Sequence, residues 1–336
     1  MDILHALIVL ANFIIVPAIA YGSQIALGAL GITLVAGVLR FSNFAAGETM
    51  AFGTMIVILV TWWFTALGLS IYPLPTALLA LPFGIIGCTA IVLITDKFVY
   101  KFYRRAKSTS VVLVMASLGV TFIMNGLIRF IIGPGDQRFA DGARFIIKAR
   151  DFKTLTGYKE GLAIKVTQSI TLVTAIIVVA ALFWFLNKTR TGKSMRAYSD
   201  NEDLALLSGI NPERVVTITW IIVAILATIA GTLYGLDKTF KPFTYFQLLL
   251  PMFAAVVVGG LGNPVGAIVG AFVIAFSEIS FTYAYKKVLT YLLPADWAPT
   301  SLVQLLSTDY KFAVSFTILV LVLVFRPTGL FKGQST

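Results

Sequence analysis

Two carboxylates lie in apolar sequence with no cation beside them, each in a run of small or helix-breaking residues. The first run, Ser42–Glu48, ends in Glu48, and the second contains Gly259–Gly266 and continues to Glu278. An ionisable group or a broken helix at membrane depth is tolerated only where it faces protein or a watery cavity. These residue types indicate a transport pathway. Its candidate lining residues are Asn43, Gly47, Glu48, Gly259, Gly260, Gly262 and Glu278.

A second interpretation of these carboxylates stays open. Each could instead form hydrogen bonds that close a helix end or a helix interface, without touching a substrate. The glycines have a similar ambiguity, because small residues let membrane helices approach closely whether or not the helices slide.

Covalent chemistry is not indicated. The sequence has one histidine, His5, and one cysteine, Cys88, and it shows no nucleophile triad, metal-ligand cluster or acid–base pair. Gly192-Lys193-Ser194 looks like the end of a phosphate-binding loop, but Asn187 stands where that loop needs its first glycine. We therefore expect no catalytic residue, no metal and no cofactor.

Composition places the chain in a membrane. Hydrophobic residues make up 58% of the sequence and charged residues 12%, and the mean hydropathy is +0.92. Soluble proteins average about 25% charged residues. The net charge of +11 comes from Lys and Arg between apolar runs, so the lipid bilayer is the expected partner and nucleic acid is not.

The apolar runs predict an all-α bundle of about ten membrane helices, with eight to ten as the range, because each span needs ~20 apolar residues. Residues 3–39 are predicted to form two spans, broken near Pro17, Tyr21 and Gly22. We expect residues 1–332 to form a single transmembrane domain with both termini in the cytoplasm. The Lys and Arg residues divide almost evenly between the two sides, so charge bias supports this orientation only weakly.

The segment 133–165 is the predicted extramembrane region on the outer side. It begins with turn residues, and Phe145–Ile147 with Leu155 could pack it down as a small strand-rich cap. This segment could be a connector at the interface or a docking surface for an external partner.

The loop 188–214 is predicted to hold a short amphipathic helix from Ser199 to Gly209. Ser199 and Glu202 have the spacing of a capping box, and Gly209 supplies a left-handed stop. A helix of about two turns is marginal alone in water, so it must pack on its own protein or insert into a partner. The residues concerned are Ser199, Asp200, Glu202, Asp203, Leu204, Ala205, Leu207 and Gly209.

Three motifs, in order along the chain, resemble the membrane permeases of bacterial ATP-binding-cassette importers for branched-chain amino acids. They are residues 22–48, which end in Asn43-Phe44-Ala45-Ala46-Gly47-Glu48; residues 190–215; and residues 258–278. The first motif is similar to that of the shorter of the two paired permease subunits. One departure is Ala46, where the family usually has histidine, so no imidazole can act at this position.

The resemblance implies a multi-pass protein of the bacterial inner membrane that transports hydrophobic amino acids by alternating access. Its partners would be cytoplasmic ATPase subunits that grip the 199–209 helix, a second homologous permease subunit and a periplasmic substrate-binding protein. ATP would be hydrolysed on those partners and not on this chain.

Two alternatives remain. Related permeases resemble one another more than their substrates do, so urea, amides or another small solute fit the same residues. An ion-coupled secondary transporter also uses broken helices and midplane carboxylates, but it does not need the capped loop helix.

Overall fold

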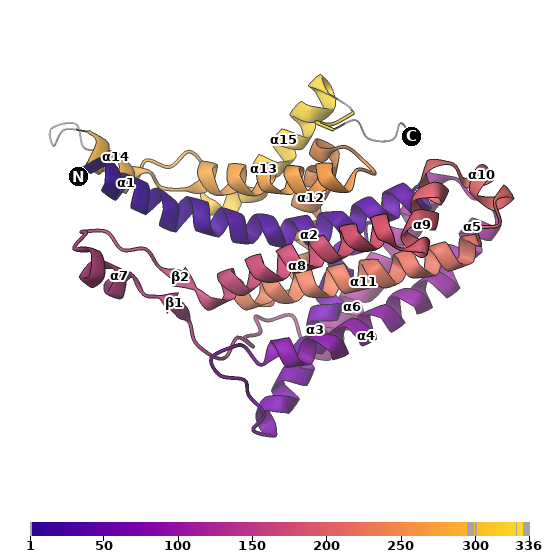
Figure 1. Ribbon diagram of the computed structural model, residues 1–336, viewed down its shortest axis with the longest axis horizontal. Coiled ribbons are helices and arrows are strands. Elements are labelled where there is room, and N and C mark those ends of the chain that lie inside the picture. The colour runs from indigo at the N-terminus through magenta and orange to yellow at the C-terminus, as the bar shows by residue number, and fades with distance from the viewer. Residues whose placement is uncertain (1, 294–298, 300, 327, 332–336) are drawn as a thin grey trace.

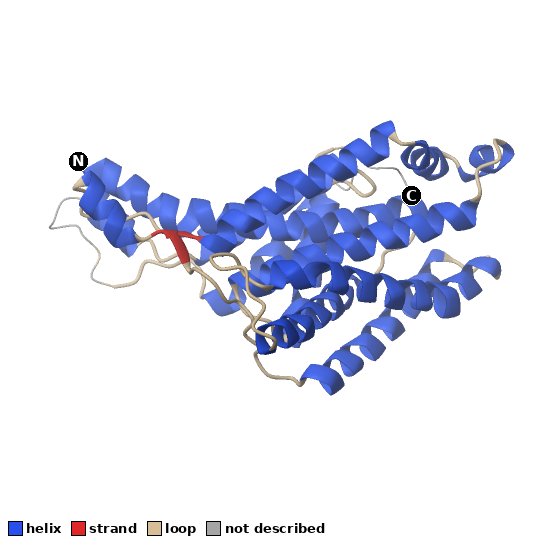
Figure 2. Cartoon of the chain, turned by 60° about the horizontal axis from the view of Figure 1, so that its bottom comes forward, coloured by secondary structure: helices blue, strands red, loops and turns tan. Residues whose placement is uncertain are grey.

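The computed structural model describes residues 2–293, 299, 301–326 and 328–331, and this part of the chain is mostly helical (Figure 2). Its two short strands, β1 (Phe145–Ile147) and β2 (Ile164–Lys165), pair antiparallel. Nine helical segments in the described residues are long and apolar enough to cross a membrane. The predicted fold class, a polytopic all-α bundle, is confirmed, and the number of spans falls within the predicted range.

The spanning segments are the following, given with the short π-helical or 3-10 segments that extend them. They are α1 (Asp2–Leu10) with η1 (Ala11–Ile15) and α2 (Val16–Leu39), α3 (Ala46–Ala66), α4 (Ala77–Thr95) with η2 (Asp96–Tyr100) and α5 (Lys101–Arg105), α6 (Ser110–Ile132), α8 (Val166–Lys188), α11 (Pro212–Asp237), α12 (Pro242–Gly259), α13 (Pro264–Thr282), and η4 (Thr308–Tyr310) with α15 (Lys311–Phe325). Outside the spans lie α7 (Ala149–Thr156), α9 (Arg190–Asp200), α10 (Glu202–Leu207) and α14 (Lys286–Leu292).

The predicted break near Pro17, Tyr21 and Gly22 is wrong. Residues 2–39 form one continuous helix, in which the π-helical turn η1 ends two residues before Pro17. A proline ring clashes with the carbonyl four residues earlier in a regular α-helix, and it lacks an N–H. The wider π turn at this point accommodates both defects, so the helix continues. The chain therefore has nine candidate spans in its described part instead of ten.

Helices α2 and α11 form the centre of the bundle. Helix α2 packs against α11, α12 and α13, and α11 also packs against α3 and α4. Nearly every residue of α2 from Ala18 onward is buried, whereas α6, α8 and α15 expose many apolar side chains at the periphery. That distribution is expected where lipid instead of water surrounds the outer helices.

The molecule has two ends, which we name by their extramembrane helices (Figure 1). The α7 end holds α1, α7, α14 and the β1–β2 pair. The α9–α10 end holds α5, α9, α10 and residues 328–331. The described residues hold an odd number of candidate spans, and α1 and residues 328–331 lie at opposite ends. These segments do not share one side, as the ten-span prediction expected of the two termini; residues 1 and 332–336 themselves lie outside the described residues.

The α7 end is a small folded cap. Glu160 accepts hydrogen bonds from Lys287 Nζ (2.7 Å) and Tyr291 Oη (2.6 Å), and His5 stacks on Tyr291. Partial burial acts to raise the pKa of Glu160, but the bonds from Lys287 and Tyr291 outweigh it and hold that pKa below its usual range. The strand predicted at Phe145–Ile147 is present. The predicted packing of Leu155 is wrong, because this residue is 86% exposed on α7.

Candidate functional site: a broken membrane segment and an exposed loop helix

A non-helical segment joins α2 to α3 and runs beside the first turns of α6. Helix α2 ends where Arg40 adopts a left-handed conformation (φ 55°). Ser110 Oγ then donates to the Arg40 carbonyl (3.2 Å), and the Phe44 N–H donates to Ser117 Oγ (3.1 Å). Asn43 Oδ1 accepts from the Ala45 N–H (3.0 Å) and from Tyr100 Oη (3.3 Å). These side chains supply the partners that a broken backbone needs away from water.

Glu48 lies in the first turn of α3 and is fully buried. Asn125 Nδ2 of α6 donates to Glu48 Oε1 (2.6 Å), while Oε2 is buried with no hydrogen-bond partner among the described residues. Gly47 has a packing role, because a Cβ at this position would lie 2.6 Å from the Tyr245 carbonyl oxygen of α12. The start of α3 therefore sits between α6 and α12, with one carboxylate oxygen uncommitted.

The second glycine run forms a tight hairpin between α12 and α13. A Cβ on Gly259 would lie 2.1 Å from the Gly266 carbonyl oxygen, and a Cβ on Gly266 would lie 2.3 Å from that of Gly259. Gly260 and Gly262 have positive φ angles (109° and 79°), and Asn263 Oδ1 accepts two backbone N–H groups at the start of α13. The hairpin lies at the α9–α10 end, where Gly262 approaches Gly37 of α2.

Glu278 lies toward the other end of α13. It is buried, and Ser315 Oγ of α15 donates to one of its oxygens. Glu48 thus lies between α3 and α6, Glu278 lies between α13 and α15, and the glycine hairpin is a third location. The structure does not bring the predicted pathway residues into one cavity, and their contact with substrate stays a prediction.

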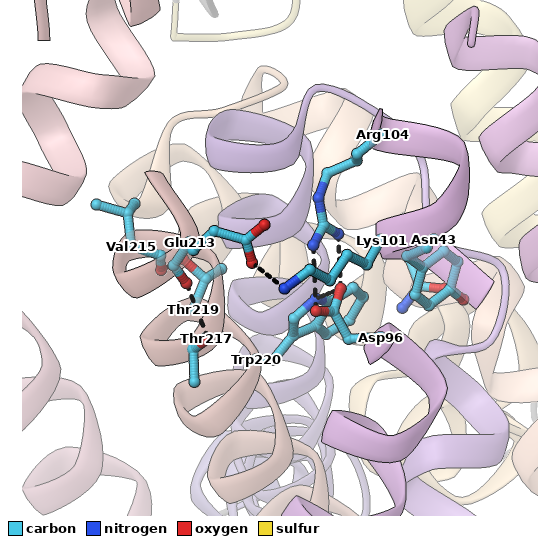
Figure 3. Close-up of polar contacts among 10 residues, drawn as sticks. Asn43, Asp96, Lys101, Arg104, Glu213, Val215, Thr217, Thr219 and Trp220 are labelled. Carbon is cyan, nitrogen blue, oxygen red and sulfur yellow. Dashed lines mark hydrogen bonds and ion pairs between the residues drawn. The ribbon is translucent and has the colours of Figure 1, made fainter. Parts of the chain in front are cut away.

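A partly buried ionic network at the α9–α10 end was not predicted (Figure 3). Asp96 in η2 accepts two bonds from Arg104 (2.6 and 3.1 Å) and one from Trp220 Nε1 of α11 (2.7 Å). Tyr100 stacks on Trp220, with ring centres 5.2 Å apart, and also reaches Asn43. Asp96 is a single acidic residue at the end of an apolar run, which could have marked it in the sequence as a candidate for a polar contact. Its partner Trp220 could not be identified in this way, because it is 124 residues away.

The loop between α8 and α11 contains two helices, α9 and α10, where one was predicted. Asn201 is the N-cap of α10, because its Oδ1 accepts the Leu204 N–H (3.0 Å). The predicted capping box is wrong: Ser199 lies inside α9 and donates to the Gly37 carbonyl of α2 (2.8 Å). The Glu202 carboxylate accepts from Tyr198 Oη (2.7 Å), and burial together with this bond raises the pKa of Tyr198 well above its usual value.

The predicted exposure and end of the loop helix are confirmed. Gly209 is left-handed (φ 79°) directly after α10. Leu204 and Leu207 are 61% and 85% exposed, while Ala205 is buried beneath them. Asp200 ends α9, and Asp203 lies in the first turn of α10. Helix α10 therefore presents two leucines and an acidic start outside the membrane.

A cavity of about 710 Å³ opens beside this loop. Arg40, Ser42, Ser110, Ser199 and Gly262 are among its lining residues, so the end of α2, the start of α6, α9 and the glycine hairpin all border it. Arg40 Nη2 also contacts the Ser199 carbonyl at 3.5 Å. The loop is thus hydrogen-bonded to the end of α2, immediately before the non-helical segment begins.

Nine apolar spans in the described residues, a broken segment inside the bundle and a glycine hairpin define a polytopic all-α membrane protein. The family model for the branched-chain amino acid transport system permease component matches residues 14–323, and the chain belongs to this family. The resemblance to this family that was inferred from the three sequence motifs is confirmed. The predicted location, a multi-pass protein of the bacterial inner membrane, is also confirmed by the family and by the apolar spans.

The chain is similar along nearly its whole length to curated relatives. It is 26% identical over 323 residues to the high-affinity branched-chain amino acid transport system permease protein LivH of Escherichia coli (93% of this chain, 92% of the relative). It is 26% identical to the corresponding protein BraD of Pseudomonas aeruginosa, with 94% of each chain covered. It is 27% identical to a probable LivH of Methanocaldococcus jannaschii (95% and 92%).

Proposed function

We propose that this chain is a permease subunit of an ATP-driven importer that moves hydrophobic, branched-chain amino acids by alternating access. The observation that supports it most is the position of α10. This capped helix exposes Leu204 and Leu207 outside the membrane, and α9 beside it is hydrogen-bonded to the end of α2. So short a helix can transmit force only if another protein grips it.

The contacts suggest how a motion at α10 would reach the pathway. Helix α10 packs on α9, and Ser199 and Arg40 join α9 to the last turn of α2. The next residues are the non-helical segment with Asn43, which Ser110 and Ser117 hold against α6. A displacement of α9 would therefore move α2 and this segment relative to α6 and change access to the 710 Å³ cavity.

The partners follow from this arrangement. A cytoplasmic ATPase would bind α10, which places the α9–α10 end in the cytoplasm and the α7 end, with segment 133–165, outside. A periplasmic binding protein would deliver substrate to the α7 end, and a second permease would complete the pathway beside the single domain that residues 1–332 would form. ATP hydrolysis belongs to the partner, and this chain needs no catalytic residue or cofactor.

The substrate class rests on the relatives, whose names specify branched-chain amino acids. Urea, amides or another small solute are the alternative within the same family. The substrate-contacting roles of Glu48, Glu278 and Asn43 belong to the same proposal, and so does the sliding of helices at Gly259, Gly260 and Gly262.

Co-purification tests the proposal. The full chain is extracted in mild detergent, and the proteins that accompany it are identified. We expect an ATPase, a second permease and a binding protein whose bound ligand is a branched-chain amino acid. Uptake driven by an ion gradient, in vesicles that contain this chain alone, would instead establish a secondary transporter.

A further inference from the structure

The helix that extends α4 at the α9–α10 end has an exposed surface that neither the pathway nor the loop helix uses. The span 77–105 has 29 residues, roughly 43 Å of helix, whereas the hydrocarbon core of a bilayer is ~30 Å thick. With Ala77 near one boundary, η2 and α5 reach the level of the lipid headgroups at the other.

Exposed basic and aromatic side chains lie together on this extension. Lys97 and Arg105 are exposed near its two ends, and Phe98 and Phe102 lie between them in the sequence. Phe98 is 73% exposed and Phe102 is 66% exposed, and Lys97 Nζ lies 5.9 Å from the centre of the Phe98 ring.

The opposite side of the extension is fixed. Asp96 is held by Arg104 and Trp220, and Lys101 is bound to Glu213 of α11 (2.8 Å) (Figure 3). These bonds leave Lys97 and Arg105, with Lys107 just beyond the helix, as exposed cations that form no ion pair within the described part of the chain. The helix and the residues just after it thus present three exposed cations, of which Lys97 lies beside the Phe98 ring.

We propose that this surface, defined by Lys97, Phe98, Phe102, Arg105 and Lys107, binds the headgroup of an anionic phospholipid. Aromatic side chains insert at the boundary between headgroups and acyl chains, and adjacent Lys and Arg side chains attract the phosphate. The helix is continuous with a membrane span, and its length places this surface at the level of the lipid headgroups. The inference does not depend on ATPase coupling.

The test measures lipid retention by the full chain. The protein is placed in nanodiscs of phosphatidylcholine and phosphatidylglycerol and then re-extracted, and the bound lipids are quantified by native mass spectrometry. Three variants are compared with the unmodified chain: Lys97→Gln/Arg105→Gln/Lys107→Gln, Phe98→Ala/Phe102→Ala, and the matched control Lys148→Gln/Arg150→Gln/Lys153→Gln at the N-cap and in the first turns of α7. Size-exclusion profiles and melting temperatures confirm that each variant is folded.

We expect the unmodified chain and the α7 control to prefer phosphatidylglycerol. Each removed charge should weaken that preference about five-fold, so the Lys97/Arg105/Lys107 variant should lose it almost completely. The phenylalanine variant should retain less of both lipids, because its rings contact acyl chains of either kind. An unchanged preference in the Lys97/Arg105/Lys107 variant would overturn the proposal. So would an equal loss in the α7 control, or the loss of a co-purifying protein from that variant with lipid preference intact.

Discussion

At the scale of single residues, the contact between Glu48 and Asn125 is open to a direct test. Glu48→Ala leaves Asn125 Nδ2 without its acceptor, which costs about 1–3 kcal/mol for a buried donor. Glu48→Gln keeps an acceptor oxygen at the same place. We expect a clearly lower melting temperature in detergent for the alanine variant and a much smaller decrease for the glutamine variant.

If both substitutions lower the melting temperature equally, the negative charge matters and the hydrogen bond does not. That result would contradict the role assigned here to the acceptor oxygen. A Thr121→Ala variant in α6 controls for general disturbance of this helix, because Thr121 bonds only to its own helix among the described contacts.

The N-cap of α10 gives a second prediction at this scale. Asn201→Ala removes the acceptor for the Leu204 N–H and should destabilise α10 by about 1 kcal/mol. Backbone amides of residues 203–207 should then exchange with deuterium several times faster. Ser199→Ala should leave their exchange unchanged, because Ser199 lies in α9 and its hydroxyl donates to the Gly37 carbonyl of α2. Faster exchange in the serine variant alone would contradict the assignment of Asn201 and support the capping box predicted from the sequence.

These residues also mark what could be predicted locally. Gly209 was predicted because a left-handed helix end depends on its own backbone. The choice between Ser199 and Asn201 as N-cap could not be made from spacing, because both are good capping residues. The carbonyl of Gly37, far away in the sequence, binds the Ser199 hydroxyl and decides between them.

At the scale of elements, the α12–α13 hairpin depends on close backbone contact. In Gly266→Ala the new methyl group would lie 2.3 Å from the Gly259 carbonyl oxygen, so the two helices must separate. We expect this variant to lose several degrees of melting temperature and much of its transport. Gly119→Ala is the matched control, because a Cβ there meets nothing within 4 Å, and alanine is the better helix former.

An unaffected Gly266→Ala variant would mean that the hairpin tolerates separation. The glycines would then not be required for packing.

Most helix positions followed from apolar runs of spanning length, and proline or glycine marked the breaks at residues 72–75 and 262–264. The first helix was the exception. Pro17 is a reliable breaker of regular α-helix, but sequence patterns do not reveal a π-helical turn such as η1. One local irregularity therefore changed the predicted number of spans and the side of the N-terminal helix.

At the scale of the whole molecule, the prediction is topological. The helical segment of 37 residues from Ile3 to Leu39 is roughly 55 Å long, so α1 must project from the membrane at the α7 end. Leu4→Cys and Thr156→Cys should react with a membrane-impermeant maleimide in intact cells, and Ser208→Cys should react only after lysis. The native Cys88 is buried and gives little background. Labelling of Leu4→Cys only after lysis would contradict the nine-span arrangement.

Which polar residues meet inside the bundle could not be predicted from the sequence. Glu48 and Glu278 look alike in their apolar runs, yet one pairs with Asn125 and the other with Ser315. The partners come from helices that are distant in sequence, and the helix periods leave their mutual rotation open. The sequence therefore identifies the candidate residues. The structure shows that they lie at three separate places, which are Glu48, Glu278 and the glycine hairpin.

The central claim is that an external ATPase drives this permease through α10. The most direct test is the amount of substrate transported per ATP hydrolysed by the purified complex in proteoliposomes, with and without Leu204→Asp/Leu207→Asp. Both side chains point outward, so the substitutions should leave the membrane helices folded. We expect transport by the double variant to fall to background. The amount of substrate transported per ATP hydrolysed should therefore also fall, because ATP hydrolysis is no longer coupled to uptake. Unchanged transport per ATP in this double variant would contradict the account.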